Sequence, residues 1–168
     1  MATILSGRLH ALAAAHALVR PSFSTRESQP LQPAASLSTL ILTILKPHEM
    51  VGAARFVVEG PDIRLGSQAT TSLALVFHEL ATNAAKYGAL LRDEGRVSIS
   101  WGQEGEALAL QWRESGGPVI AAEPVQKGFG STLARNTIIY QLGGTFTLDW
   151  QAQGLVASFL LPLANLAH

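Results

Sequence analysis

The chain has 168 residues, of which 48% are hydrophobic and 14% charged, so it can form one folded domain with a sizeable core and is not mainly disordered. Its 12 basic and 12 acidic residues give a formal net charge of zero, which removes the electrostatic basis for nucleic acid or an anionic membrane as the principal partner. Because cysteine is absent, disulfides, a thiolate zinc site and a cysteine nucleophile are excluded.

The start of the chain lacks the basic residues and the long apolar stretch of a signal peptide. No run approaches the roughly 20 apolar residues that a membrane helix needs. We therefore expect a cytoplasmic chain that makes no membrane contact in this segment.

The first 45 residues predict two helices separated by a linker. Apolar residues recur at steps of three and four over residues 3–19, which is typical of an amphipathic helix that packs on the domain or on another chain. Residues 20–36 contain Pro21, Pro30 and Pro33 and are predicted to be a loop or linker. A second helix is expected over residues 35–45, ended by Pro47.

The remaining pattern alternates strands and helices. Residues 54–59 and 63–65, joined by Gly-Pro-Asp, are expected to form a β-hairpin. A long helix then covers residues 68–90, and a shorter one begins at the Gly-Phe-Gly of residues 128–130 and ends at Gly143. Two further hairpins are predicted from the strands at 96–101, 107–112, 145–150 and 155–161. Strands that arrive as hairpins indicate an α+β fold, a two-layer sandwich with a mixed, mostly antiparallel sheet.

The helix at 68–90 carries the densest set of placed polar groups. Glu79, Asn83 and Lys86 follow one another at i, i+4 and i+7, so a carboxylate, a carboxamide and an ammonium share one helix face. Such a row suits a metal-bound polyphosphate. The alternative interpretation, a solvated surface with a weak charge pattern, stays open on this helix alone.

Two other segments supply what that row lacks. Glu114 leaves its strand where it can accept a hydrogen bond from an exocyclic amine, and Gly116 and Gly117 let the backbone approach a flat base. Gly130 and Ser131 begin a helix whose free N–H groups can bind phosphate, with Lys127 close by in sequence. The Walker A motif, the zinc motif His-Glu-x-x-His and the hydrolase elbow are all absent.

These motifs closely resemble the catalytic domain of HWE-type bacterial sensor histidine kinases. The resemblance rests on His78-Glu-Leu-Ala-Thr-Asn-Ala-Ala-Lys-Tyr-Gly-Ala-Leu90, then Gly95-Arg-Val-x-x-x-Trp101, Trp112-x-Glu-x-Gly-Gly-Pro118 and Gly128-Phe-Gly130. It covers residues 65–162 strongly and the first helix more loosely. The histidine, tryptophan and glutamate that name the group match His78, Trp112 and Glu114.

The resemblance implies a Bergerat-type fold that binds ATP with Mg²⁺ and works in two-component signalling with a response regulator. It implies that Asn83 ligates Mg²⁺, Lys86 contacts phosphate, Glu114 binds adenine and residues 119–130 form the ATP lid. Its nucleotide-binding set also takes in the residues around these positions: Tyr87, Gly116, Gly117, Lys127, Gly128, Phe129, Gly130 and Ser131. Glu79, Asn83 and Lys86 are the catalytic candidates.

The resemblance also predicts the domain boundaries. Residues 1–20 resemble the second helix of a dimerisation hairpin, residues 21–36 a linker, and residues 37–168 the catalytic domain. The family's phospho-acceptor motif, His-Arg-x-Lys-Asn, does not occur here, so we expect the acceptor histidine to lie outside this chain. Homodimerisation through the first helix is a further expectation.

Two alternatives to a kinase remain at this stage. The Glu-x-x-x-Asn spacing of Glu79 and Asn83 fits equally an ATPase of the same superfamily, in which Glu79 activates water. A non-catalytic module that keeps the fold but docks a regulator, or a second copy of itself, is the other.

Overall fold

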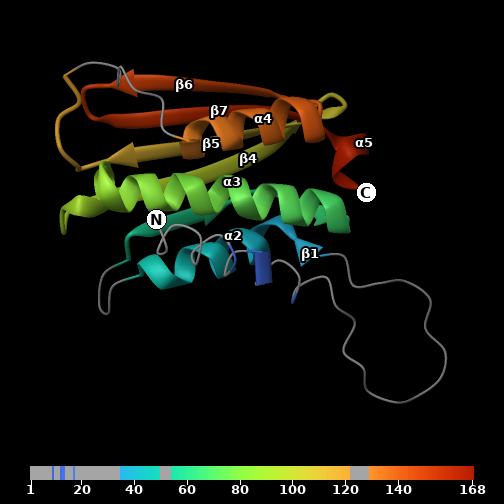
Figure 1. The fold of residues 1–168 in the computed structure, drawn as a ribbon, viewed down its shortest axis with the longest axis horizontal. Coiled ribbons are helices and arrows are strands. Elements are labelled where there is room, and N and C mark those ends of the chain that lie inside the picture. The colour runs from blue at the N-terminus through green and yellow to red at the C-terminus, as the bar shows by residue number, and fades with distance from the viewer. Residues whose placement is uncertain (1–8, 10–11, 14–16, 18–34, 50–53, 122–128) are drawn as a thin grey trace, which may run out of the picture.

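The computed structural model describes residues 9, 12, 13, 17, 35–49, 54–121 and 129–168, and the fold is taken from these ranges (Figure 1). Most of the predicted first helix and linker, and the predicted site residues Lys127 and Gly128, lie outside the described residues. The residues described between positions 9 and 17 are helical, as the sequence predicts. None of the described helices is long and apolar enough to cross a bilayer.

Helices and strands form two layers (Figure 1). The main sheet has the order β2-β4-β5-β7-β6, and only the β2–β4 pair is parallel. Its strands are β2 (Phe56–Glu59), β4 (Arg96–Glu104), β5 (Ala107–Ser115), β6 (Thr145–Gln151) and β7 (Gly154–Pro162). The helices α2 (Leu37–Leu45), α3 (Ser67–Lys86) and α4 (Phe129–Asn136) lie side by side on one face. This arrangement confirms the predicted α+β sandwich with a mixed, mostly antiparallel sheet.

The sheet has a buried face because its strands alternate. In β4 the side chains of Val97, Ile99 and Trp101 are buried, and in β5 those of Leu108, Leu110 and Trp112. Successive side chains of a strand point to opposite faces, so each set lies on the face that the helices cover. Trp101 and Trp112 are therefore core aromatics.

Helix α3 lies along the centre of the helix layer. It contains no Gly or Pro, and its buried side chains include Leu73, Phe77 and Leu80, which follow helical spacing. The Phe77 ring lies 6.5 Å from the Phe159 ring of β7. The start of α3 is fixed by the chain end, because the amide of Ala69 donates to the carbonyl of His168 at 3.0 Å. The helix is therefore anchored at its beginning and held along its length by the sheet.

The predicted hairpin at residues 54–65 is wrong. Strand β2 pairs in parallel with β4, whereas β3 (Arg64–Leu65) pairs with a different short strand, β1 (Ala35–Ser36). A three-residue hairpin loop commonly contains one residue in the left-handed region, and Gly60, the glycine of this turn, is not among the described glycines with positive φ. The segment instead passes over Trp101, whose indole donates to the carbonyl of Pro61 at 2.8 Å.

The helix predicted at 128–142 is present, although its second half is a π-helix, η3 (Thr137–Gln141). Gly143, with a φ of 62°, ends it as expected, because a left-handed residue is cheapest as glycine. Short 3₁₀-helices follow α2 and α3: η1 (Lys46–His48) and η2 (Ala89–Leu91). The last helix, α5 (Leu163–Leu166), packs on β7 and α3.

Candidate nucleotide-binding site

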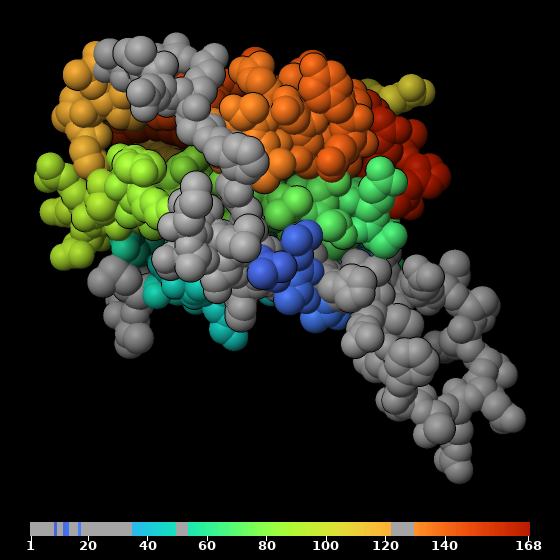
Figure 2. Space-filling model, viewed as in Figure 1, coloured from blue at the N-terminus to red at the C-terminus, as the bar shows by residue number. Residues whose placement is uncertain are grey.

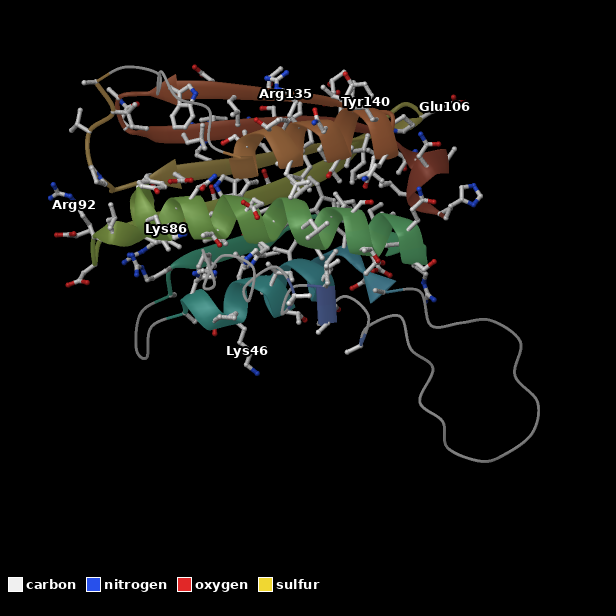
Figure 3. The ribbon with its side chains drawn as sticks, viewed as in Figure 1. Lys46, Lys86, Arg92, Glu106, Arg135 and Tyr140 are labelled. Atoms are coloured by element: carbon white, nitrogen blue, oxygen red, sulfur yellow. The ribbon has the colours of Figure 1, made fainter. Side chains whose placement is uncertain are left out.

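The three polar residues of α3 become more exposed toward the end of the helix. Glu79 is 6% exposed and lies in the protein interior, whereas Asn83 is half-buried and Lys86 is exposed. Figure 3 shows Lys86 near the end of α3. The C-terminal part of this row can therefore meet a ligand at the surface, while the carboxylate of Glu79 lies further inside.

The end of α3 is shaped by the backbone of Asn83. Its carbonyl accepts hydrogen bonds from the amides of Tyr87 at 2.8 Å and Gly88 at 3.2 Å, which closes the last turn of the helix. The chain then enters η2, which begins at Ala89. Tyr87, predicted to bind nucleotide, is 75% exposed and follows directly after Lys86. The main chain of Asn83 and the segment that follows it thus form one tightly bonded corner.

The carboxylate of Glu114, at the end of β5, bonds to this corner. The amide of Ala89 donates to its Oε2 at 2.9 Å, and the indole nitrogen of Trp112 donates to its Oε1 at 3.2 Å. Trp112 and Glu114 are two residues apart on a strand, so both side chains point to the same buried face. Each carboxylate oxygen has a further lone pair, which leaves Glu114 able to accept another hydrogen bond.

Burial sets the protonation behaviour of Glu114. The side chain is 4% exposed, and its removal from water raises the pKa of the carboxyl above its ordinary value. The hydrogen bonds from the Ala89 amide and the Trp112 indole act in the opposite direction but do not cancel the effect. Glu114 is thus a buried carboxyl whose two fixed donors favour its ionised form.

Glycines allow the corner and the strand end to approach each other. A Cβ atom at Gly88 would collide with Oε2 of Glu114, and one at Gly117 would lie 2.6 Å from the Cα of Ala89. Gly116 has a φ of 70°, a conformation that favours glycine. The sequence suggested that Gly116 and Gly117 make room for a base; the structure gives them a second reason, because they pack against the segment that follows α3.

The start of α4 lies close to the same end of α3. The two helices pack together and run in opposite directions (Figure 1), and the Ser72 hydroxyl lies 3.1 Å from Oε1 of Gln141. Starting from the contact between Ser72 and Gln141, Asn83 lies as many residues further along α3 as Gly130 lies earlier in the chain toward the start of α4. Because the two helices run in opposite directions, Gly130 and Ser131 lie roughly level with Asn83. Figure 2 shows a hollow between the end of α3 and residues 115–121. Three segments distant in sequence therefore meet here.

The predicted set is not brought together completely. Lys127 and Gly128 lie outside the described residues, as does the side chain of Phe129, although Phe129 begins α4. Arg135 lies over the ring of Phe146, with its guanidinium carbon 5.9 Å from the ring centroid, and Figure 3 shows Arg92 projecting from the end of the molecule. Within the described ranges no group of three or more His, Asp or Glu side chains could hold a metal ion.

Sequence reasoning missed the backbone amide of Ala89 and the side chain of Arg55. An amide donor carries no residue-type signal, so only the structure reveals that Ala89 fixes Glu114. Arg55 is 4% exposed and donates hydrogen bonds to carbonyls of the segment that follows α3. Arginine is rarely buried so fully, and the residue pattern around position 55 gives no sign that this side chain lies in the interior.

The architecture is that of a histidine kinase catalytic domain. A histidine kinase domain structure from Erythrobacter litoralis matches 95% of this chain and 75% of its own, with a TM-score of 0.72 at 18% identity. The catalytic domain of the histidine kinase ThkA matches 76% of this chain and 93% of its own, with a TM-score of 0.55 at 19% identity. At such identities the likeness concerns the fold.

The relatives in sequence are more specific. Blue-light-activated histidine kinase 1 of Erythrobacter litoralis is 42% identical over 162 residues, which cover 95% of this chain and 43% of that protein. Blue-light-activated histidine kinase of Brucella ovis is 32% identical over 165 residues, covering 95% of this chain and 32% of that protein. No protein family model matches. The chain is thus a homologue of histidine kinases that spans less than half the length of these relatives.

Proposed function

We propose that residues 37–168 form the ATP-binding catalytic domain of a two-component sensor histidine kinase of the HWE type. The observation that carries the proposal is the buried carboxylate of Glu114, which Ala89 and Trp112 hold beside the residues that follow α3. A carboxylate fixed in this way suits the exocyclic amine of adenine, and a helix start suits phosphate. The 42% identity to a histidine kinase supports the same conclusion.

In this proposal each polar group has one task. Glu114 accepts a hydrogen bond from adenine, Lys86 neutralises phosphate charge, and the amides of Gly130 and Ser131 bind phosphate oxygens. The carboxamide oxygen of Asn83 is an acceptable ligand for Mg²⁺ but only one, so the ion would arrive with ATP and keep several waters. Bound Mg²⁺ would supply charge neutralisation for phosphoryl transfer, which otherwise depends on positioning.

The proposal extends to partners and to the segments beyond the described residues. Residues 119–130, with Lys127, Gly128 and Phe129, would close over ATP as a lid. The γ-phosphoryl group would go to a histidine on an acceptor helix outside this chain, and from there to the receiver domain of a response regulator, in the cytoplasm. Residues 1–20 would belong to a dimerisation hairpin, joined through the linker at 21–36.

Asn83→Ala tests the metal and nucleotide assignment. Since the variant removes the only proposed protein ligand of Mg²⁺, calorimetric titration should show a Mg-ATP affinity reduced by about tenfold to hundredfold. Asn136→Ala, which changes an exposed asparagine at the end of α4, is the matched control and should bind as the unmodified chain does. Equal affinity in all three proteins would refute the assignment of Asn83.

Transfer to a supplied acceptor distinguishes the kinase from the ATPase. With labelled ATP, we expect acid-labile phosphohistidine on an acceptor helix from a related kinase. Release of inorganic phosphate without labelled histidine, abolished by Glu79→Gln, would instead favour hydrolysis. A chain that binds no adenine nucleotide would be the non-catalytic module.

A further inference from the structure

Arg55 is a buried cation placed immediately before β2. Its side chain is 4% exposed, and its guanidinium donates to the carbonyls of Gly95 at 3.3 Å, Leu90 at 3.0 Å and Arg92. Its own backbone carbonyl accepts the amide of Val97 at 2.9 Å, which fixes Arg55 to the start of β4. A charged group is buried at little cost only when several hydrogen bonds replace its water, and these carbonyls provide them.

The three carbonyls belong to the segment that links α3 to β4. That segment also bonds internally: the amide of Arg92 donates to the carbonyl of Ala89 at 3.2 Å, and the amide of Gly95 to that of Arg92 at 3.1 Å. A Cβ atom at Gly95 would collide with the carbonyl of Ala89, so the two residues are in close contact. Residues 89–95 therefore form one unit, and Arg55 holds it at three points.

The same unit positions the Glu114 carboxylate. The amide of Ala89 is one of the two protein donors that the structure gives to Glu114, and it lies one residue before the first carbonyl that Arg55 binds. A displacement of the segment would move this amide away from Oε2. Arg55 binds the carbonyls of Leu90, Arg92 and Gly95, so its influence on the Ala89 amide would pass through the backbone of residues 89–95.

Only arginine can make this set of contacts. Its planar guanidinium has five N–H donors in a fixed fork, which spans several carbonyls at once. Lysine keeps the charge on a single ammonium and cannot reproduce the fork. Methionine keeps the approximate length and has no donor, so the carbonyls of Leu90, Arg92 and Gly95 would each lose a partner.

We propose that Arg55 is a positioning residue that fixes the Ala89 amide and thereby the orientation of Glu114. Its effect on nucleotide choice rests on the proposed function, in which Glu114 recognises adenine. Its effect on the geometry of Ala89 and Glu114 does not depend on any nucleotide. The two parts can therefore be tested separately on the same proteins.

The test compares Arg55→Met and Arg55→Lys with Arg96→Met as the matched control. Arg96 also donates to carbonyls of this segment, those of Asp93 and Gly95 at 3.0 Å each, but its side chain is exposed. Amide hydrogen exchange is measured by NMR without nucleotide for Ala89, with the core amide of Leu110 as the reference for global opening. The Trp112 indole N–H signal reports on Glu114.

We expect Arg55→Met to accelerate exchange at Ala89 more than at Leu110 and to shift the Trp112 indole signal. Arg55→Lys should give intermediate values, and Arg96→Met should leave both signals unchanged. In calorimetry the preference for Mg-ADP over Mg-GDP should fall roughly two- to thirtyfold in Arg55→Met. If Arg55→Met does not fold, as judged by circular dichroism, Arg55→Lys decides the matter with the same signals.

Unchanged exchange at Ala89 in a folded Arg55 variant would overturn the inference. So would equal acceleration at Ala89 and Leu110, because that is the result of a purely structural role, or an equal effect in Arg96→Met. If the unmodified chain binds neither nucleotide, the proposed function fails, and the exchange measurements still decide whether Arg55 positions the Ala89 amide.

Discussion

Glu114 acquires its properties from neighbours of two different kinds. Trp112 could be associated with it from the sequence, because residues two apart on a strand share a face. The Ala89 amide could not, because alanine in a helix-terminating stretch gives no sign of where its N–H points. The sequence thus predicted that Glu114 is the carboxylate of the site and that it lies at the end of a strand. It could not predict the Ala89 amide as a donor, because that contact depends on how the backbone after α3 folds.

The raised pKa of Glu114 makes a prediction about stability and pH. Because the folded protein holds this proton more tightly than the unfolded chain, whose ordinary pKa is 4.5, the folded state binds more protons between that value and the raised one. The free energy of unfolding should therefore fall, relative to Glu114→Gln, as the pH rises through that window. Urea unfolding of both proteins at several pH values measures the difference, and a difference that is constant or increases would contradict the burial effect.

At the scale of elements, the long periodic segments were predictable and the short ones were not. Helix α3 has twenty residues of consistent spacing, and β4 and β5 alternate over nine residues each, so their type followed from pattern. Strand β3 has only two residues, too few for a pattern. Its pairing with β1, and the parallel pairing of β2 with β4, depend on segments distant in sequence, which local signals cannot identify.

The electrostatic effect of His78 on His48 makes a prediction at this scale. His48 of η1 is half-buried, and loss of water together with the charge of His78 on α3 lowers its pKa below 6.5. As the pH falls, His48 is therefore protonated in the unfolded chain before it is protonated in the folded one. The free energy of unfolding should decrease as the pH falls from 6.5 through the lowered pKa of the folded state. His48→Gln should reduce this loss. Chemical unfolding at about pH 7.5 and about pH 5.5 measures it, and an identical pH dependence in both proteins would contradict the account.

The fold class of the whole molecule was predictable from the sequence, whereas the candidate site was predictable only as separate groups of residues. Hairpin-like strands between helices indicated an α+β sandwich, and the structure confirms it with one parallel pair. That Asn83, Glu114 and Gly130 belong to one site was expected from their complementary chemistry and then from the resemblance, not from spacing. It requires the strand order β4-β5-β7 and the antiparallel packing of α3 and α4, which are long-range features.

The most direct test of the account is an NMR titration of the chain with a Mg²⁺-bound, non-hydrolysable ATP analogue. The amide signals of Ala89, Gly117, Gly130 and Ser131 and the indole signal of Trp112 should shift together as the nucleotide saturates one site. Signals from the turn at Gly105, which joins β4 and β5 away from this hollow, should stay in place. No shift at any of the five site signals, or shifts centred on Gly105, would contradict the claim that this domain binds ATP between α3, β5 and α4.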